Sequence, residues 1–196
     1  MKLRRALVAV ATTAAIASTT LLAATSANAA PSTPSAPSGL CTTGNPHYKP
    51  VLRTTISGLP VEIKAGSGWR NFTLTLDNPS QAKVTNIHLF AGVSSTTEGF
   101  KAFPTSQVSL QAYFPKTKRW ENVTDTAGHT DGYFGWASIS AHHHINIPMR
   151  INVTKKAPAG KAMDLGAGFY QDAKNKCTAI TAATYKFQII APAKHA

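Results

Sequence analysis

Three consecutive histidines at positions 142–144 are the residues of this chain best suited to binding a metal. Alternate side chains of an extended segment share a face, so His142 and His144 would present two imidazole ligands suited to zinc, copper or nickel. A closed zinc site needs four ligands, so His129 or Asp131 would have to complete it through the fold. The favoured interpretation is instead a polar turn that opens the strand beginning near Ile145.

Aromatic residues crowd a second segment, the glycine-rich residues 131–136. Exposed rings stack on the faces of sugars, and a neighbouring Asp or Asn can hydrogen-bond the hydroxyl groups. Tyr133 and Trp136 therefore suggest a carbohydrate-binding surface. The favoured interpretation is that the rings are buried, because the cores of β-sandwiches commonly hold a tryptophan.

Catalytic machinery is hard to find in this sequence. Its eight acidic residues are dispersed and mostly lie beside turns, whereas glycosidases need two carboxyls placed across the scissile bond. There is no Gly-x-Ser-x-Gly elbow, no His-Glu-x-x-His and no glycine-rich phosphate loop. We therefore expect no catalytic residue, no cofactor and no enzymatic activity.

The chain is strongly basic, with 20 Lys and Arg against 8 Asp and Glu. The positive electrostatic field of such a chain favours polyanionic partners. The alternative is that the charge serves only to keep the protein soluble. Its clusters are Lys116, Lys118 and Arg119, and Lys155 and Lys156, which we expect to be exposed on turns and to contact an anionic wall polymer. No basic run resembles a nucleic-acid-binding arm, so nucleic acid is not an expected partner.

Residues 1–29 have the pattern of a secretory signal peptide. A basic start is followed by the apolar stretch Ala6–Ala24 and by the small-residue triplet Ala27–Ala29. An uncleaved membrane anchor is the alternative. The signal peptide predicts a secreted protein that meets an oxidising environment, possessing no transmembrane segment after cleavage.

The only two cysteines, Cys41 and Cys177, then predict one disulfide. Residues 30–50 predict a linker rich in Pro, Ser and Ala and an N-terminal arm, residues 51–191 the folded domain, and residues 192–196 a polar tail without a sorting signal. We expect no covalent anchor to the cell surface.

Apolar residues alternate with polar ones throughout the predicted domain, as in half-buried strands. No sustained helical repeat occurs. This pattern predicts a single all-β domain, an antiparallel sandwich of immunoglobulin-like type with about seven to nine strands, and a barrel is the alternative. The expected segments lie near residues 52–57, 61–64, 72–76, 84–93, 108–114, 120–123, 145–153, 163–169 and 185–189.

Two stretches resemble bacterial immunoglobulin-like modules. Residues 72–87 are similar to their second and third strands with the Asn-Pro turn between them, and residues 152–160 are similar to their Ala-Pro-Ala-Gly turn. Taken whole, the chain resembles the small secreted immunoglobulin-like proteins of actinomycetes. The resemblance implies the fold and says little about chemistry. Export, the sandwich and the basic charge together predict a non-enzymatic binding or structural module at the cell envelope, and pairing with a protein partner through a sheet edge is the alternative. The resemblance leaves the oligomeric state open.

Overall fold

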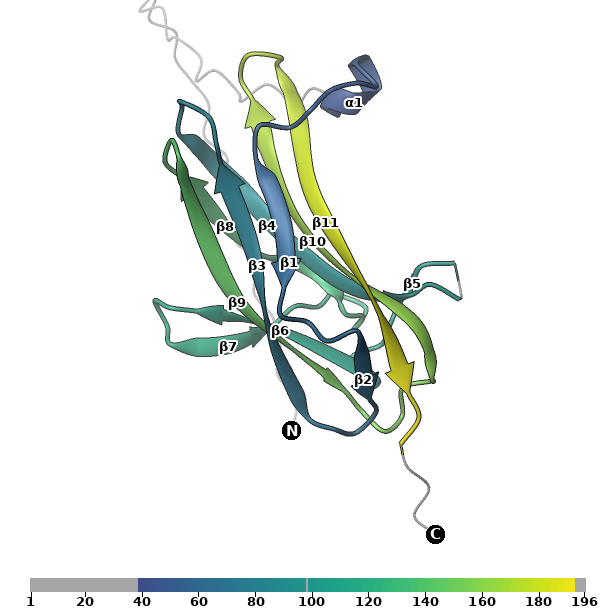
Figure 1. The fold of residues 1–196 in the computed structure, drawn as a ribbon. Coiled ribbons are helices and arrows are strands. Elements are labelled where there is room, and N and C mark those ends of the chain that lie inside the picture. The colour runs from purple at the N-terminus through teal and green to yellow at the C-terminus, as the bar shows by residue number, and fades with distance from the viewer. Residues whose placement is uncertain (1–38, 98, 193–196) are drawn as a thin grey trace, which may run out of the picture. The chain divides into compact units, whose positions relative to one another are not determined.

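The structure is a computed structural model that describes residues 39–97 and 99–192. These residues form one short helix and eleven strands, arranged as two sheets packed face to face (Figure 1). The expected all-β, immunoglobulin-like sandwich is confirmed. The proposed signal peptide and residues 193–196 lie outside the described residues. The elements are α1 Cys41–Gly44, β1 Arg53–Ser57, β2 Glu62–Lys64, β3 Trp69–Asn78, β4 Val84–Ser95, β5 Lys101–Ala102, β6 Val108–Phe114, β7 Arg119–Asn122, β8 Asp131–Ile139, β9 His143–Val153, β10 Gly160–Asp172 and β11 Cys177–Ile190.

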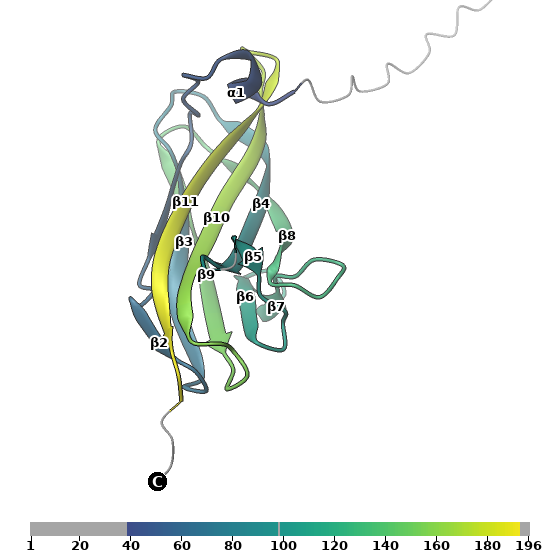
Figure 2. The ribbon, with the colours of Figure 1, turned by 90° about the vertical axis from the view of Figure 1, so that its right-hand side faces the viewer.

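Strand order places distant parts of the sequence side by side (Figures 1 and 2). The five-stranded sheet has the order β1-β3-β9-β6-β7. The six-stranded sheet has the order β2-β11-β10-β4-β5, with β8 also paired to β4. Strands β5 and β8 are the two that the sequence pattern did not indicate. No helix in the described ranges is long and apolar enough to cross a membrane.

Period-two alternation explains the core between the sheets. In β3, β4 and β9 the apolar members of the alternation point inward, and the polar members face solvent. Val84, Ile145 and Ile147 are partly buried against the core, and the other inward apolar side chains of these three strands are buried, as the alternation predicted. The buried ones are Phe72, Leu74, Leu76, Ile87, Leu89, Ala91, Val93, Met149, Ile151 and Val153.

Strand β10 reverses this pattern. Its alternation predicted that Met163, Leu165 and Phe169 would face the core, and this prediction is wrong. They are only partly buried on the outer face, whereas the inward positions include Asp164, Gly166 and Gly168. The reason is steric, because Leu74 and Leu76 of the opposite sheet fill the space over the two glycines.

Gly166 supplies a test of this close packing. A β-carbon there would overlap Leu74 Cδ1, and Leu74 is fully buried. We expect Gly166→Ala to lower the free energy of unfolding by about 1–3 kcal/mol in a denaturant titration. Gly44→Ala is the matched control, because a β-carbon at position 44 meets nothing within 4 Å. Equal stability of the two variants would contradict the packing argument.

A buried acid accompanies the small residues of β10. Asp164 is 1% exposed, and its Oδ1 has no hydrogen-bond partner among the residues that the structure describes. Burial raises the pKa of Asp164 to about 8. The carboxyl therefore stays largely protonated in the folded protein at neutral pH. Its burial lowers the free energy of unfolding at every pH at which the carboxyl would be ionised in the unfolded chain.

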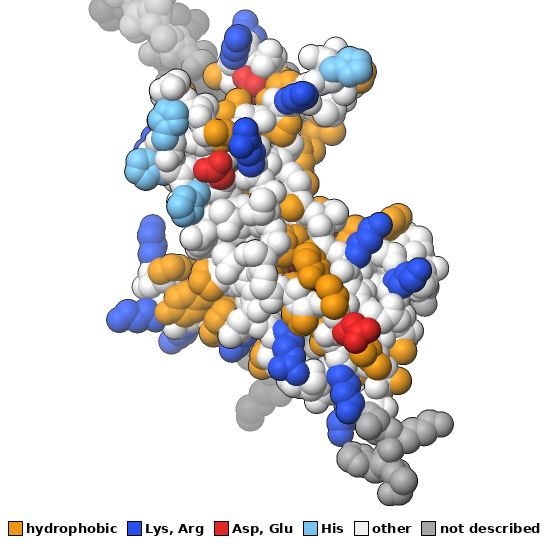
Figure 3. Space-filling model, in the orientation of Figure 1, with side chains coloured by type: hydrophobic (Ala, Val, Ile, Leu, Met, Phe, Trp, Pro, Cys, Tyr) orange, Lys and Arg blue, Asp and Glu red, His pale blue; other side chains and the backbone are white. Residues whose placement is uncertain are grey.

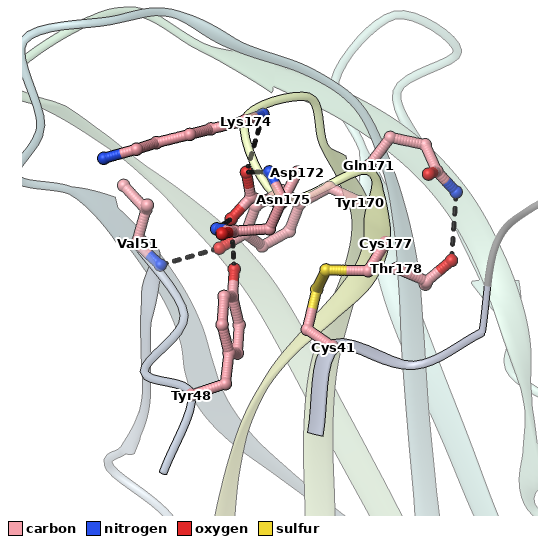
Figure 4. Close-up of a disulfide and its surroundings, with 10 residues drawn as sticks. All are labelled: Cys41, Tyr48, Val51, Tyr170, Gln171, Asp172, Lys174, Asn175, Cys177 and Thr178. Carbon is pink, nitrogen blue, oxygen red and sulfur yellow. Dashed lines mark hydrogen bonds between the residues drawn. A yellow bond between two sulfur atoms is a disulfide. The ribbon is translucent and has the colours of Figure 1, made fainter. Parts of the chain in front are cut away.

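The N-terminal arm, residues 39–52, is fastened to the hairpin of β10 and β11 (Figure 4). The predicted disulfide between Cys41 and Cys177 is present, with the two Cα atoms 5.0 Å apart. The Tyr48 hydroxyl donates to Asp172 Oδ2 at 2.6 Å, and the Val51 amide donates to the Tyr170 hydroxyl at 2.7 Å. The Leu52 amide also donates to the Tyr170 hydroxyl, and the Thr178 amide donates to the Gly39 carbonyl oxygen. A covalent bond and four hydrogen bonds thus hold the arm on the sandwich.

Candidate functional site

The outer face of the five-stranded sheet carries a cation held between two aromatic rings. Arg150 of β9 has its guanidinium carbon 4.4 Å from the ring centroid of Trp69 and 4.4 Å from that of Trp120. We call these three residues the Trp–Arg–Trp stack. It joins β3, β9 and β7 and leaves the charge at the surface.

Hydrogen bonds from neighbouring strands position the Arg150 side chain. Its Nε donates to Gln111 Oε1 at 2.8 Å, and Gln111 Nε2 donates to Asn122 Oδ1 at 2.7 Å. Among the described residues, the one ion pair is between His129 and Asp125, so no carboxylate neutralises Arg150. The two Nη groups likewise have no acceptor within the described part of the chain. An oriented guanidinium of this kind can bind a carboxylate or phosphate oxygen.

A shallow hollow of about 360 Å³ adjoins the stack. Trp120 forms part of its wall, and the side chains of Ser57, Asn71 and Thr73 contribute hydroxyl and amide groups to the lining. These groups can donate and accept hydrogen bonds. The face therefore offers a ligand both a positive charge and partners for its hydroxyl groups.

The basic residues predicted from the sequence lie on two loops. Lys116, Lys118 and Arg119 are exposed on the hairpin of β6 and β7, beside Trp120 of the stack. In Figure 3, Lys and Arg side chains border an apolar patch where Figure 1 shows this hairpin. Lys155 and Lys156 are exposed on the turn after β9. The predicted exposure of all five is confirmed, whereas their role in binding stays a prediction.

The sequence analysis missed Arg150 and Trp69. Arg150 is the single charged residue on the outward alternation of β9, where its companions are Asn146, Pro148 and Asn152. That isolated charge is the signal available in the sequence. Its two tryptophan neighbours come from strands about 80 and 30 residues away, and only the sheet order joins them.

The six-stranded sheet carries aromatic residues on its outer face. Tyr133 is 61% exposed and Trp136 is 79% exposed, so the interpretation that they belong to the core is wrong. Ring centroids lie 5.3 Å apart for Tyr133 and Phe90, and 5.9 Å apart for Trp136 and His88. With Phe169, 5.5 Å from Tyr133, these residues form what we call the outer aromatic patch.

A β-bulge explains why both rings face outward. Residues three apart on a regular strand point to opposite faces. In β8, however, Tyr133 pairs with Phe90 and Gly135 pairs with Leu89, so Phe134 is an extra residue. The bulge brings Tyr133 and Trp136 to one face, while Phe134 packs against the core.

The histidine triplet does not have the geometry that its spacing suggested. His142 lies before β9 with φ of 57°, so it does not share a regular extended segment with His144. Its Nε2 is 2.9 Å from Gln81 Oε1, and the His143 Nδ1 is 2.8 Å from the Ala141 carbonyl oxygen. These contacts are those of the polar turn that was the favoured interpretation.

His129 and Asp131 cannot complete a metal site with the triplet. Asp131 is the first residue of β8, and the histidine triplet follows the last residue of that strand. A nine-residue strand is about 25 Å long, so Asp131 and the triplet lie at opposite ends of it. His129 instead pairs with Asp125, its Nδ1 3.0 Å from Asp125 Oδ2, and hydrogen bonds from the backbone and ring of His129 lower the pKa of Asp125. Within the described ranges, no three His, Cys, Asp or Glu residues form a group able to hold a metal. Metal binding by His142 and His144 therefore has no supporting cluster.

Comparisons with known proteins indicate the fold. No family model and no curated protein matches the chain. The solved structure described as "AvmM Catalyzes Macrocyclization in Alchivemycin A Biosynthesis" matches with a TM-score of 0.54 and 10% identity, covering 74% of this chain and 92% of its own. The CARDB domain of PF1109 from Pyrococcus furiosus, solved with di-metal ions, matches with a TM-score of 0.41 and 9% identity, covering 71% of this chain and 87% of its own. Native alpha-2-macroglobulin from Escherichia coli, from domain MG7 to the C-terminus, matches with a TM-score of 0.46 and 7% identity over 71% of this chain and 16% of its own. At 10% identity, the likeness to the first of these structures extends to the fold alone.

Proposed function

We propose that this protein is an exported, non-enzymatic binding module of the cell envelope, which holds an anionic wall polymer on the outer face of its five-stranded sheet. The observation that carries the proposal is the Arg150 guanidinium, oriented between two indole rings and without a carboxylate partner in the described part of the chain. A phosphate or carboxylate of the polymer would supply the missing acceptor.

Charge around the stack supports a polymeric ligand. The Lys116–Arg119 cluster lies beside Trp120, and Lys155 and Lys156 follow the end of the strand that carries Arg150. One guanidinium binds one acidic group, whereas several exposed cations on neighbouring loops attract a chain of such groups. The hydroxyl and amide groups of the adjoining hollow suit the sugar or polyol units between them.

Export and the lack of catalysis are parts of the same proposal. The signal-like start of the chain and the Cys41–Cys177 disulfide both suit an oxidising location outside the cytoplasm. Within residues 39–97 and 99–192, the polar groups that line the hollow beside the stack include no carboxylate or histidine that could act as an acid or base. Binding alone therefore accounts for this face.

The test is binding of purified poly(glycerol phosphate) teichoic acid. We expect the affinity to fall at least about tenfold between about 0.05 M and 0.5 M salt, because attraction between exposed charges is screened. Arg150→Ala should weaken binding at low salt by about tenfold or more, and Arg150→Lys should restore only part of the loss, because lysine lacks the planar fork. Isothermal titration calorimetry at two salt concentrations measures both effects.

The matched control is Lys186→Ala, which removes the same charge from an exposed position on the six-stranded sheet. It should change the affinity by less than about threefold. Equal losses in the Lys186 and Arg150 variants would show that net charge alone governs binding. Retention that is independent of salt would refute the proposal altogether.

A further inference from the structure

The outer face of the six-stranded sheet contains a second hollow, of about 400 Å³, beside the outer aromatic patch. That volume lies within the range of small-ligand sites, roughly 300–1,000 Å³. Trp136 and Phe169 form aromatic parts of its lining. Residues from four different strands, β4, β8, β10 and β11, meet there, namely Asn86, His88, Trp136, Phe169, Tyr170, Gln171 and Thr178.

We infer that this hollow, here called the saccharide hollow, is a binding site for a neutral saccharide. A pyranose ring has a face of C–H groups that packs on an aromatic ring and a rim of hydroxyl groups that need hydrogen-bond partners. Trp136 suits the first requirement, because 79% of its surface is exposed. The planes of its ring and of the His88 ring are perpendicular, at 89°, so the two rings are not stacked face to face.

Polar side chains of the lining suit the second requirement. Asn86 lies at the bulge of β4 with φ of 53°, and its side-chain amide has no hydrogen-bond partner among the described residues. Gln171 Nε2 donates to Thr178 Oγ1 at 3.0 Å, which leaves Gln171 Oε1 as an acceptor and the Thr178 hydroxyl as a donor. A ring stacked on Trp136 would thus meet donors and acceptors from β4, β10 and β11.

Charge distinguishes this ligand from the anionic polymer of the proposed function. In the described part of the chain, the saccharide hollow is lined by no Lys, Arg, Asp or Glu. The Trp–Arg–Trp stack, in contrast, lies on the opposite sheet around a cation. The inference therefore does not rest on the proposed function. Binding at the saccharide hollow should be insensitive to salt, and loss of one site should leave the other intact.

The experiment titrates the purified protein with cellohexaose, maltohexaose, mannohexaose and chitohexaose, following tryptophan fluorescence and calorimetric heats. We expect at least one of these neutral saccharides to bind with an affinity that changes by less than about twofold between low and high salt. Trp136→Ala should weaken that binding by about tenfold or more, and Gln171→Ala by a smaller factor.

Two controls make the result specific. Phe100→Ala removes another exposed aromatic residue, 64% exposed and outside the saccharide hollow, and should leave binding unchanged. Arg150→Ala should keep saccharide binding while it loses the teichoic acid. Absence of binding by all four saccharides would overturn the inference, as would equal affinity of the wild type and Trp136→Ala. A dimer in light scattering that Trp136→Ala dissociates would also overturn it, since the aromatic face would then be an interface between two copies.

Discussion

Replacing Asp164 with asparagine is expected to raise the free energy of unfolding near pH 8 by about 3–5 kcal/mol and to leave it nearly unchanged near pH 4. The carboxyl is buried between the sheets, and its pKa in the folded protein is about 8. In the unfolded chain it ionises near pH 4. Between these values the folded state binds more protons than the unfolded state does, so wild-type stability falls as the pH rises. Asparagine has no proton to lose, and the fall should disappear.

Chemical denaturation at pH 4, 6 and 8 measures this difference. Glu62→Gln is the control, because it removes a carboxylate from an exposed position on the edge strand β2. It should leave the difference between pH 4 and pH 8 as in the wild type. A stability gain from Asp164→Asn that is the same at every pH would contradict the argument, since it would show that Asp164 is not protonated on folding.

Where one face of a strand is apolar and the other polar, the sequence alone predicted the structure. The alternation of β9 predicted that Met149, Ile151 and Val153 would be buried, and all three are. The disulfide followed from cysteine count and the expected export. The alternation is a local feature of the sequence, and the disulfide follows from there being only two cysteines. Neither prediction requires knowing which strands are neighbours.

The sequence did not predict the outward apolar face of β10, which depends on the opposing sheet, or the shared face of the β8 rings, which depends on a bulge. Strand β10 has apolar residues at alternate positions, but Leu74 and Leu76 leave room only for glycines beneath them, and the apolar set turns outward. Strand β8 contains a bulge at Phe134, so period-two reasoning separates rings that actually share a face. Both departures place apolar side chains on the outside of the same sheet. Places where a chain departs from the pattern of apolar residues inward and polar residues outward are often functional surfaces. The outward apolar side chains of β8 and β10 therefore agree with a ligand at the saccharide hollow.

The Trp–Arg–Trp stack on the five-stranded sheet was not predicted from the sequence, for a different reason. Trp69, Trp120 and Arg150 occur in three separate segments, and only Arg150, the isolated charge on its strand, stands out in the sequence. The three side chains form a stack only because the sheet places β9 between β3 and β6, with β7 next to β6. All three tryptophans of the chain thus lie on outer faces rather than in the core, and Trp136 is the most exposed of the large hydrophobic side chains described.

Replacing both cysteines with serine is expected to lower the free energy of unfolding by about 4 kcal/mol. The disulfide closes a loop with a sequence separation of 136 residues, for which loop entropy gives about 4–5 kcal/mol, and hydrogen bonds from the arm to the sandwich do not replace this covalent restraint. Denaturant titration measures the change. Hydrogen exchange should show amides of residues 41–52 losing protection before those of β3 and β9, because the arm is then held by a few bonds at one edge.

Acid should release the arm in that variant. Burial alone would raise the pKa of Asp172, but hydrogen bonds from Tyr48, Asn175 and the backbone amide of Lys174 hold it below its ordinary value. A carboxyl with a lowered pKa stabilises the folded state above the unfolded pKa, near 4, and loses this effect as the pH falls further. Tyr48→Phe in the cysteine-free background removes one of those bonds and should open the arm already at neutral pH. If that variant protects residues 41–52 as well as its parent does, the Tyr48 hydrogen bond to Asp172 does not hold the arm.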